Sequence, residues 1–84
     1  MRNPIYAKPI RLHLLPLFNQ ADIPLEKAPS SFIYHVGHLP YDRFLSANLN
    51  AHAARLLYHA EKGSIALTQK KLGPFTYVYI ATKH

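Results

Sequence analysis

The 84-residue chain contains no cysteine and no tryptophan, only three glycines and only four acidic residues. Without cysteine there are no disulfide bonds and no thiolate metal ligands, although small secreted domains usually depend on such cross-links. No apolar run approaches the roughly 20 residues that a membrane-spanning helix needs. The apolar run 12–18 is interrupted by His13 and Pro16, which is not typical of a signal peptide. We therefore expect a cytoplasmic protein that is not anchored in a membrane.

The shortage of carboxylates bears on catalysis and on metal binding. The four acids are widely spaced: Asp22, Glu26, Asp42 and Glu61. A catalytic carboxylate pair would have to be assembled by the fold, and the serines and glycines form no nucleophile elbow or phosphate-binding loop. His35 and His38 could bind zinc together with Asp42, but such histidines are more often polar surface or core groups. We expect no enzymatic activity, no metal site and no cofactor.

Positive charge is what the chain has in excess. Ten Lys and Arg residues against four acids give a formal net charge of +6, and 49% of the residues are hydrophobic. This hydrophobic content is sufficient for a single folded domain spanning residues 1–84. The charge favours an anionic partner, which can be a nucleic acid, an acidic protein or a membrane surface.

The N-terminal segment 1–40 is rich in proline, which argues against a long helix there. Within it, residues 10–14 alternate between apolar and polar and suggest a strand, with a short helix as the alternative. Residues 31–36 are β-branched and aromatic and predict a second strand, although a helix over 30–38 is also compatible with the sequence. The stretch 19–30 between them is expected to be a loop.

Residues 41–63 predict the main helix of the domain. From Leu45 onward the apolar residues recur at helical spacing on one stripe, and several alanines raise the helix propensity. Lys62 suits the last turn and Gly63 the position just beyond it, so we expect a helix over 45–62. Three residues could cap its N-terminus: Asp42, Ser46 and Asn48.

Residues 64–83 predict a β-hairpin, with strands at 65–71 and 75–82 joined around Gly73 and Pro74. An even-numbered turn would place the aliphatic side chains of both strands on one face, against the helix: Ile65, Leu67, Val78 and Ile80. The other face would then carry the aromatic side chains and a lysine: Tyr77, Tyr79 and Lys70. We expect a small α+β domain with one main amphipathic helix followed by this hairpin; a β-β-α-β-β order is the alternative.

Two groups of basic residues are candidates for binding. At about 100° per residue, one stripe of the helix carries polar and basic side chains without an acid: Asn48, His52, Arg55, His59 and Lys62. Such a stripe suits the major groove of DNA, where Arg and Asn read bases and Lys contacts phosphate; it is equally compatible with an ordinary solvated helix face. Lys70 and Lys71 at the hairpin could hold phosphates or simply discourage edge pairing.

The order of helix, Gly63 and hairpin resembles the C-terminal half of a winged helix-turn-helix domain over residues 48–82. The resemblance implies duplex DNA binding, commonly as a dimer. It would place four residues on the recognition helix and two in the wing: Asn48, His52, Arg55 and His59, then Lys70 and Lys71. The family has two helices before the recognition helix, whereas this chain has the proline-rich segment 1–40, so residues 39–46 would have to supply a shortened second helix.

The sequence therefore favours a small basic protein that binds nucleic acid, most concretely a duplex-DNA-binding regulator with helix 45–62 in the groove. The alternative is a protein-interaction module, either a homodimer or a small inhibitor of an acidic protein. In that case Tyr77 and Tyr79 would form the partner interface, because tyrosine favours half-exposed sites. The same two rings beside Lys70 could also stack on single-stranded nucleic acid.

Overall fold

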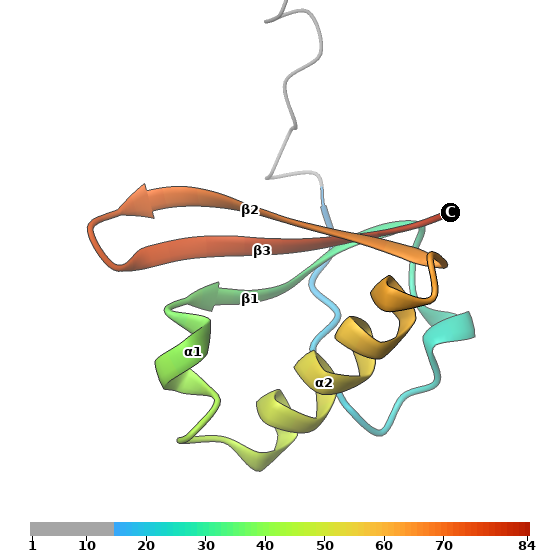
Figure 1. Ribbon diagram of the computed structural model, residues 1–84, viewed down its shortest axis with the longest axis horizontal. Coiled ribbons are helices and arrows are strands. Elements are labelled where there is room, and N and C mark those ends of the chain that lie inside the picture. Colours follow the sequence, from blue (N-terminus) through green and yellow to red (C-terminus); the bar gives the residue numbers. More distant parts are fainter. Residues whose placement is uncertain (1–14) are drawn as a thin grey trace, which may run out of the picture.

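The computed structural model describes residues 15–84 (Figure 1). The strand or short helix expected at 10–14 lies outside these residues. After a 3₁₀ turn, two helices are inserted between the first strand and a C-terminal hairpin. The elements are the 3₁₀ turn Leu25–Lys27, β1 (Ser31–Gly37), α1 (Leu39–Asp42), α2 (Ala47–Glu61), β2 (Ile65–Gly73) and β3 (Thr76–Lys83).

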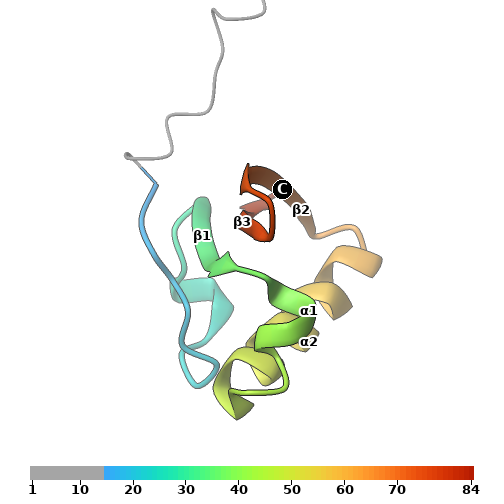
Figure 2. The same cartoon turned by 90° about the vertical axis from the view of Figure 1, so that its left-hand side faces the viewer.

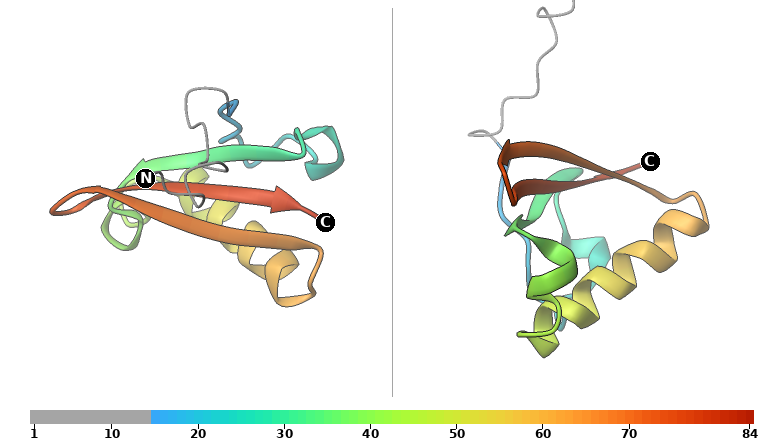
Figure 3. Two further views of the ribbon diagram at one scale, coloured as in Figure 1. Left: turned by 90° about the horizontal axis from the view of Figure 1, so that it is seen from above. Right: turned by 60° about the vertical axis from the view of Figure 1, so that its left-hand side comes forward.

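The three strands form an antiparallel sheet in the order β1-β3-β2, so the last strand lies between the other two (Figure 3). Both helices lie on the same side of this sheet (Figures 1 and 2). The expected α+β domain with one main helix and a C-terminal hairpin is thus confirmed. Residues 31–37 form a strand and not a helix, and β1 is the one strand that precedes α2 within residues 15–84.

Local signals place the ends of α2. Ser46 is the N-cap, and its side-chain oxygen accepts a hydrogen bond from the Leu49 amide at 3.1 Å. At the other end Gly63 adopts a positive φ of 83°, a conformation that glycine adopts without steric cost. The helix begins two residues later than its apolar spacing predicts, because Leu45 belongs to the turn that joins α1 to α2.

The predicted register of the hairpin is wrong, and a β-bulge is the reason. The even-numbered turn forms as expected, with Gly73 opposite Thr76, but the register shifts by one residue between Lys71 and Gly73. Leu67 therefore lies opposite Ala81, and the aliphatic residues of β2 share a face with the tyrosines of β3. A bulge inserts one residue, and since side chains alternate with period two, every pair beyond it changes face.

The core lies between this face of the sheet and α2. Its buried members come from both strands of the hairpin, from β1, from α2 and from the loop before β1: Ala28, Phe32, Tyr34, Leu56, Ile65, Tyr79 and Ala81. The hydroxyl of Tyr79 accepts a hydrogen bond from the Leu39 amide at 3.1 Å, so the ring is buried with its polar group satisfied. Tyr79 is therefore a core residue that positions α1.

The segment before β1 runs along the outer edge of that strand. Ile33 bonds to it in both directions, with its amide donating to Pro16 and its carbonyl accepting from the Phe18 amide, both at 2.9 Å. Residues 18–28 then pass beside α2 (Figure 2) before the chain enters β1. The loop expected at 19–30 is confirmed, apart from the short 3₁₀ turn within it.

Candidate functional site

His52, in the middle of the basic stripe of α2, is fully buried. Its Nε2 lies 2.9 Å from the Phe18 carbonyl oxygen and its Nδ1 lies 2.8 Å from a terminal nitrogen of Arg55. A guanidinium only donates hydrogen bonds, so Nδ1 is the acceptor and Nε2 carries the proton. Burial lowers the pKa of His52 below its ordinary value of 6.5, and the nearby Arg55 charge lowers this pKa further. The ring is a neutral structural group.

Arg55 extends from α2 to the loop before β1. One terminal nitrogen donates to the Ile23 carbonyl at 2.7 Å, and the other donates to the Gln20 carbonyl at 3.0 Å as well as to His52. Asn48 makes a similar bridge, because its amide donates to the Asn19 carbonyl and its side-chain oxygen accepts from the Ala21 amide, both at 2.9 Å.

Asn48, His52 and Arg55 together form what we call the loop clamp, which holds residues 18–23 against α2. The predicted groove-reading face is therefore covered in its middle. The prediction that His52 contacts nucleic acid is contradicted by its burial, and the guanidinium of Arg55 is already bonded to two backbone carbonyls. A loop without regular pairing leaves backbone carbonyls that need hydrogen-bond donors when they are covered, and this is the signal that could have revealed the clamp.

The remaining predicted binding residues have different environments. His59 is half-buried with its ring against Tyr58, and Lys62 is exposed with Nζ 5.0 Å from the centre of the same ring. Lys70 and Lys71 are both exposed on β2, so a role for them at a phosphate stays a prediction. The expected tyrosine interface is wrong for Tyr79, which is buried.

Tyr77 is half-buried against the core rather than presented on a free face. Lys83, which the sequence did not single out, donates from Nζ to the carbonyls of Ala28 at 2.6 Å and Leu25 at 3.3 Å. It secures the same N-terminal segment as the loop clamp, from the sheet side. The two contacts show that this positive charge, too, serves the fold.

Large apolar side chains are exposed on two segments at one end of the molecule. These segments are α1 with the turn that follows it, and the turn of the hairpin β2–β3 (Figure 1). Phe44 is 87% exposed and Phe75 is 76% exposed. We call this region the apolar end, and its members are Tyr41, Phe44, Leu45, Leu72 and Phe75. The ring of Phe75 meets His38, the residue before α1, edge-on at 6.2 Å between centroids, which connects the two halves of the region.

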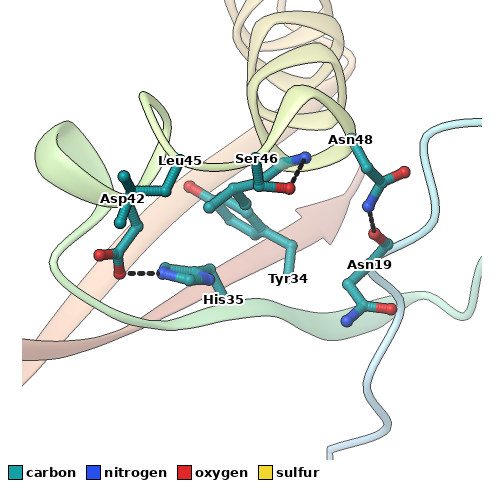
Figure 4. A pocket seen from close by; sticks show the side chains of 8 residues that line it. Asn19, Tyr34, His35, Asp42, Leu45, Ser46 and Asn48 are labelled. Atoms are coloured by element: carbon teal, nitrogen blue, oxygen red, sulfur yellow. Dashed lines mark hydrogen bonds and ion pairs between the residues drawn. The ribbon is translucent and has the colours of Figure 1, made fainter.

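A cavity of about 330 Å³, lined by both polar and apolar side chains, lies between α1, the start of α2 and β1 (Figure 4). His35 Nε2 and Asp42 Oδ2 are 2.6 Å apart at its edge, and the same carboxylate oxygen accepts from the His38 amide at 3.0 Å. The hydrogen bond from His35 holds the pKa of Asp42 below its ordinary value of 3.8. The carboxylate is therefore charged near neutrality and ties α1 to β1.

This cavity contains a histidine, an acid and Ser46, but their geometry is not that of a nucleophile with its base. The Ser46 oxygen accepts the Leu49 amide, and within residues 15–84 no hydrogen bond joins it to His35. A catalytic serine needs such a bond to an oriented base. Tyr34 also lines the cavity, and burial raises its pKa to about 12, so the hydroxyl stays protonated. The contacts that these groups make tie α1 to β1 and cap the start of α2.

Within the described part of the chain, no group of three or more His, Cys, Asp or Glu side chains is placed to hold a metal ion. No helix among residues 15–84 is long and apolar enough to cross a membrane.

No family model matches this chain, and comparisons with curated proteins and with solved structures found no match either. The resemblance to winged helix-turn-helix domains therefore stays a prediction.

Proposed function

We propose that this protein is a small protein-binding module that contacts its partner through the apolar end. The observation that carries the proposal is the exposure of Phe44 and Phe75, the two most exposed large apolar side chains of residues 15–84. Several large apolar side chains left exposed at one end of a small soluble domain are a candidate interaction surface. Full burial of a phenylalanine stabilises a complex by about 1.5–3 kcal/mol before the costs of association.

The partner is expected to be a different protein rather than a second copy. Two chains that each carry +6 repel one another, so a homodimer is the less favoured form of this proposal. A cytoplasmic location is part of the proposal, and the lack of cysteine supports it.

The test is a selection of peptides from a random phage-displayed library on the full-length protein. We expect peptides whose binding is lost in the double variant Phe44→Ser, Phe75→Ser and retained in Leu57→Ser. Leu57 is a suitable control because it is an exposed leucine on α2, outside the apolar end. Equal binding to both variants, or no selected peptide at all, would refute the assignment.

A second candidate function is binding of duplex DNA through the hairpin, in a regulatory role. It is favoured by the exposure of Lys70 and Lys71 on β2 and by the net charge of the chain. Anisotropy with a random duplex at about 50 mM and about 200 mM salt should then show binding that falls steeply with salt. The double variant Lys70→Gln, Lys71→Gln should weaken it, whereas Lys27→Gln, Lys62→Gln should have a smaller effect. No binding at low salt would exclude this candidate.

A further inference from the structure

Arg43 lies within the apolar end, in the turn after α1, and its orientation is held from α2. Its Nε donates to the Asn50 side-chain oxygen at 2.9 Å. Arg43, Phe44 and Asn50, together with Pro40, line an open cavity of about 550 Å³. Within residues 15–84 the two terminal nitrogens of this guanidinium make no hydrogen bond, in contrast to those of Arg55. The cavity thus combines an oriented cation with an exposed aromatic ring.

The charges around the apolar end are predominantly positive. Lys70 and Lys71 precede its hairpin members, and the nearby acid, Asp42, is paired with His35. The other three acids of the described chain lie on other elements, namely the loop before β1 and the last residue of α2: Asp22, Glu26 and Glu61. The last turn of α2 is at the opposite end of the helix from α1 (Figure 1). An anionic partner is therefore attracted to the apolar end and not repelled from it.

We propose that this cavity binds a carboxylate side chain of the partner, with a large apolar residue of the same segment placed on Phe44. The proposal rests on the proposed function and specifies the partner as an acidic, apolar protein segment. A guanidinium whose Nε is already engaged still presents its two terminal nitrogens, and these form paired hydrogen bonds to the two oxygens of a carboxylate. The hydrogen bond to Asn50 reduces the entropy lost when Arg43 is immobilised by its ligand.

A nucleic acid phosphate would also satisfy Arg43, but the surroundings favour a protein. A duplex offers phosphates, sugars and base edges, which leave Phe44, Phe75 and Leu45 without an apolar counterpart. A protein segment supplies both the carboxylate and the apolar surface. Nucleic acid is therefore treated as an outcome of the test.

The test uses the strongest peptide obtained from the random library and measures its affinity by fluorescence anisotropy. We expect the selected peptides to contain Asp or Glu close to a large apolar residue. Replacing that acid by alanine should weaken binding to the wild-type protein by about tenfold, and by less than about twofold in Arg43→Gln. The control Lys27→Gln, which removes the same charge from the 3₁₀ turn before β1, should behave like the wild type.

Each result separates this inference from the proposed function. Peptides without acids, or an acid whose removal weakens both proteins equally, would overturn the carboxylate site even if binding still depends on Phe44 and Phe75. Loss of that dependence would overturn both proposals. Binding of a random duplex that falls about tenfold in Arg43→Gln, with no selected peptide, would assign the site to phosphate and overturn the inference. If Arg43→Gln fails to fold, Arg43→Lys serves instead, because it keeps the charge but loses the paired hydrogen bonds. In Arg43→Lys, replacing the acid of the peptide by alanine should still weaken binding by less than it does with the wild-type protein.

Discussion

Replacing Arg55 by alanine should destabilise the fold, because it removes the central donor of the loop clamp. Arg55 donates to the carbonyls of Ile23 and Gln20 and to His52. Hydrogen bonds to a charged group contribute about 1.5–3 kcal/mol each, and a covered acceptor left unpaired costs about 1–3 kcal/mol. The bond to Gln20 is exposed, so water replaces it readily. We therefore expect the free energy of unfolding to fall by about 2–4 kcal/mol.

Urea unfolding followed by circular dichroism measures this loss directly. For a domain of this size 1 kcal/mol corresponds to about 4–8 °C in Tm, so a fall of at least about 8 °C is expected in a thermal scan. The control is Lys27→Ala, which removes an exposed positive charge and should change the stability by less than about 0.5 kcal/mol.

The opposite result is equally informative about Arg55. If Arg55→Ala unfolds like the control but loses affinity for a duplex, Arg55 is a recognition residue on an open helix face, as its place in the basic stripe suggested. The loop clamp would then be refuted. If the variant is destabilised, the positive charge of Arg55 stabilises the fold and is not a recognition group.

Three further predictions concern buried groups and backbone. Burial lowers the pKa of His52 in the folded protein, so as the pH falls below about 6.5 the unfolded chain takes up the proton first and stability is lost. Urea unfolding measured from about pH 7.5 to about pH 5 should therefore show a weaker pH dependence in His52→Gln than in the wild type. The same pH dependence in both proteins would contradict the neutral state assigned to His52. Gly37 has a φ of 147°, and a Cβ there would lie 2.5 Å from Asp42 Oδ2, so Gly37→Ala should cost at least about 2 kcal/mol in thermal unfolding. Gly63→Ala, with nothing within 4 Å of its Cβ, should cost about 1 kcal/mol. Equal losses of stability in Gly37→Ala and Gly63→Ala would refute the predicted clash between a Cβ at position 37 and Asp42. Burial raises the pKa of Tyr34 to about 12, so as the pH rises above about 10 the unfolded chain loses this proton first and stability falls. Urea unfolding above about pH 10 should show a weaker pH dependence in Tyr34→Phe, and an unchanged dependence would contradict the assignment.

The helix and the strands could be predicted because their signals are local. Ser46 and Gly63 mark the two ends of α2. The aromatic and β-branched run before Gly37 favours the strand β1, although a helix over 30–38 is also compatible with the sequence. These signals need only a few neighbouring residues and the preference of each type for a backbone conformation. The faces of the hairpin could not be predicted. One bulge between Lys71 and Gly73 exchanges the two faces of β2 relative to β3, and no residue type in this stretch requires a bulge.

The candidate site required information that spans the chain. Asn48, His52 and Arg55 do form one stripe, as helical spacing predicts, yet their partners lie 27 to 35 residues away in the sequence. The apolar end likewise joins α1 to a hairpin turn that comes more than 30 residues later. Neither juxtaposition is visible in periodicity, since periodicity describes one element at a time.

By itself the sequence determined the class of the domain, the place of its main helix and hairpin, and an excess of positive charge. The tertiary structure alone decided which positive charges are available to a partner. A basic side chain satisfies a backbone carbonyl or an external anion by the same hydrogen bonds, and the choice depends on whether a distant segment covers it. In this protein the loop before β1 covers Arg55, whereas Arg43 lies beside the exposed ring of Phe44 in the turn that precedes α2.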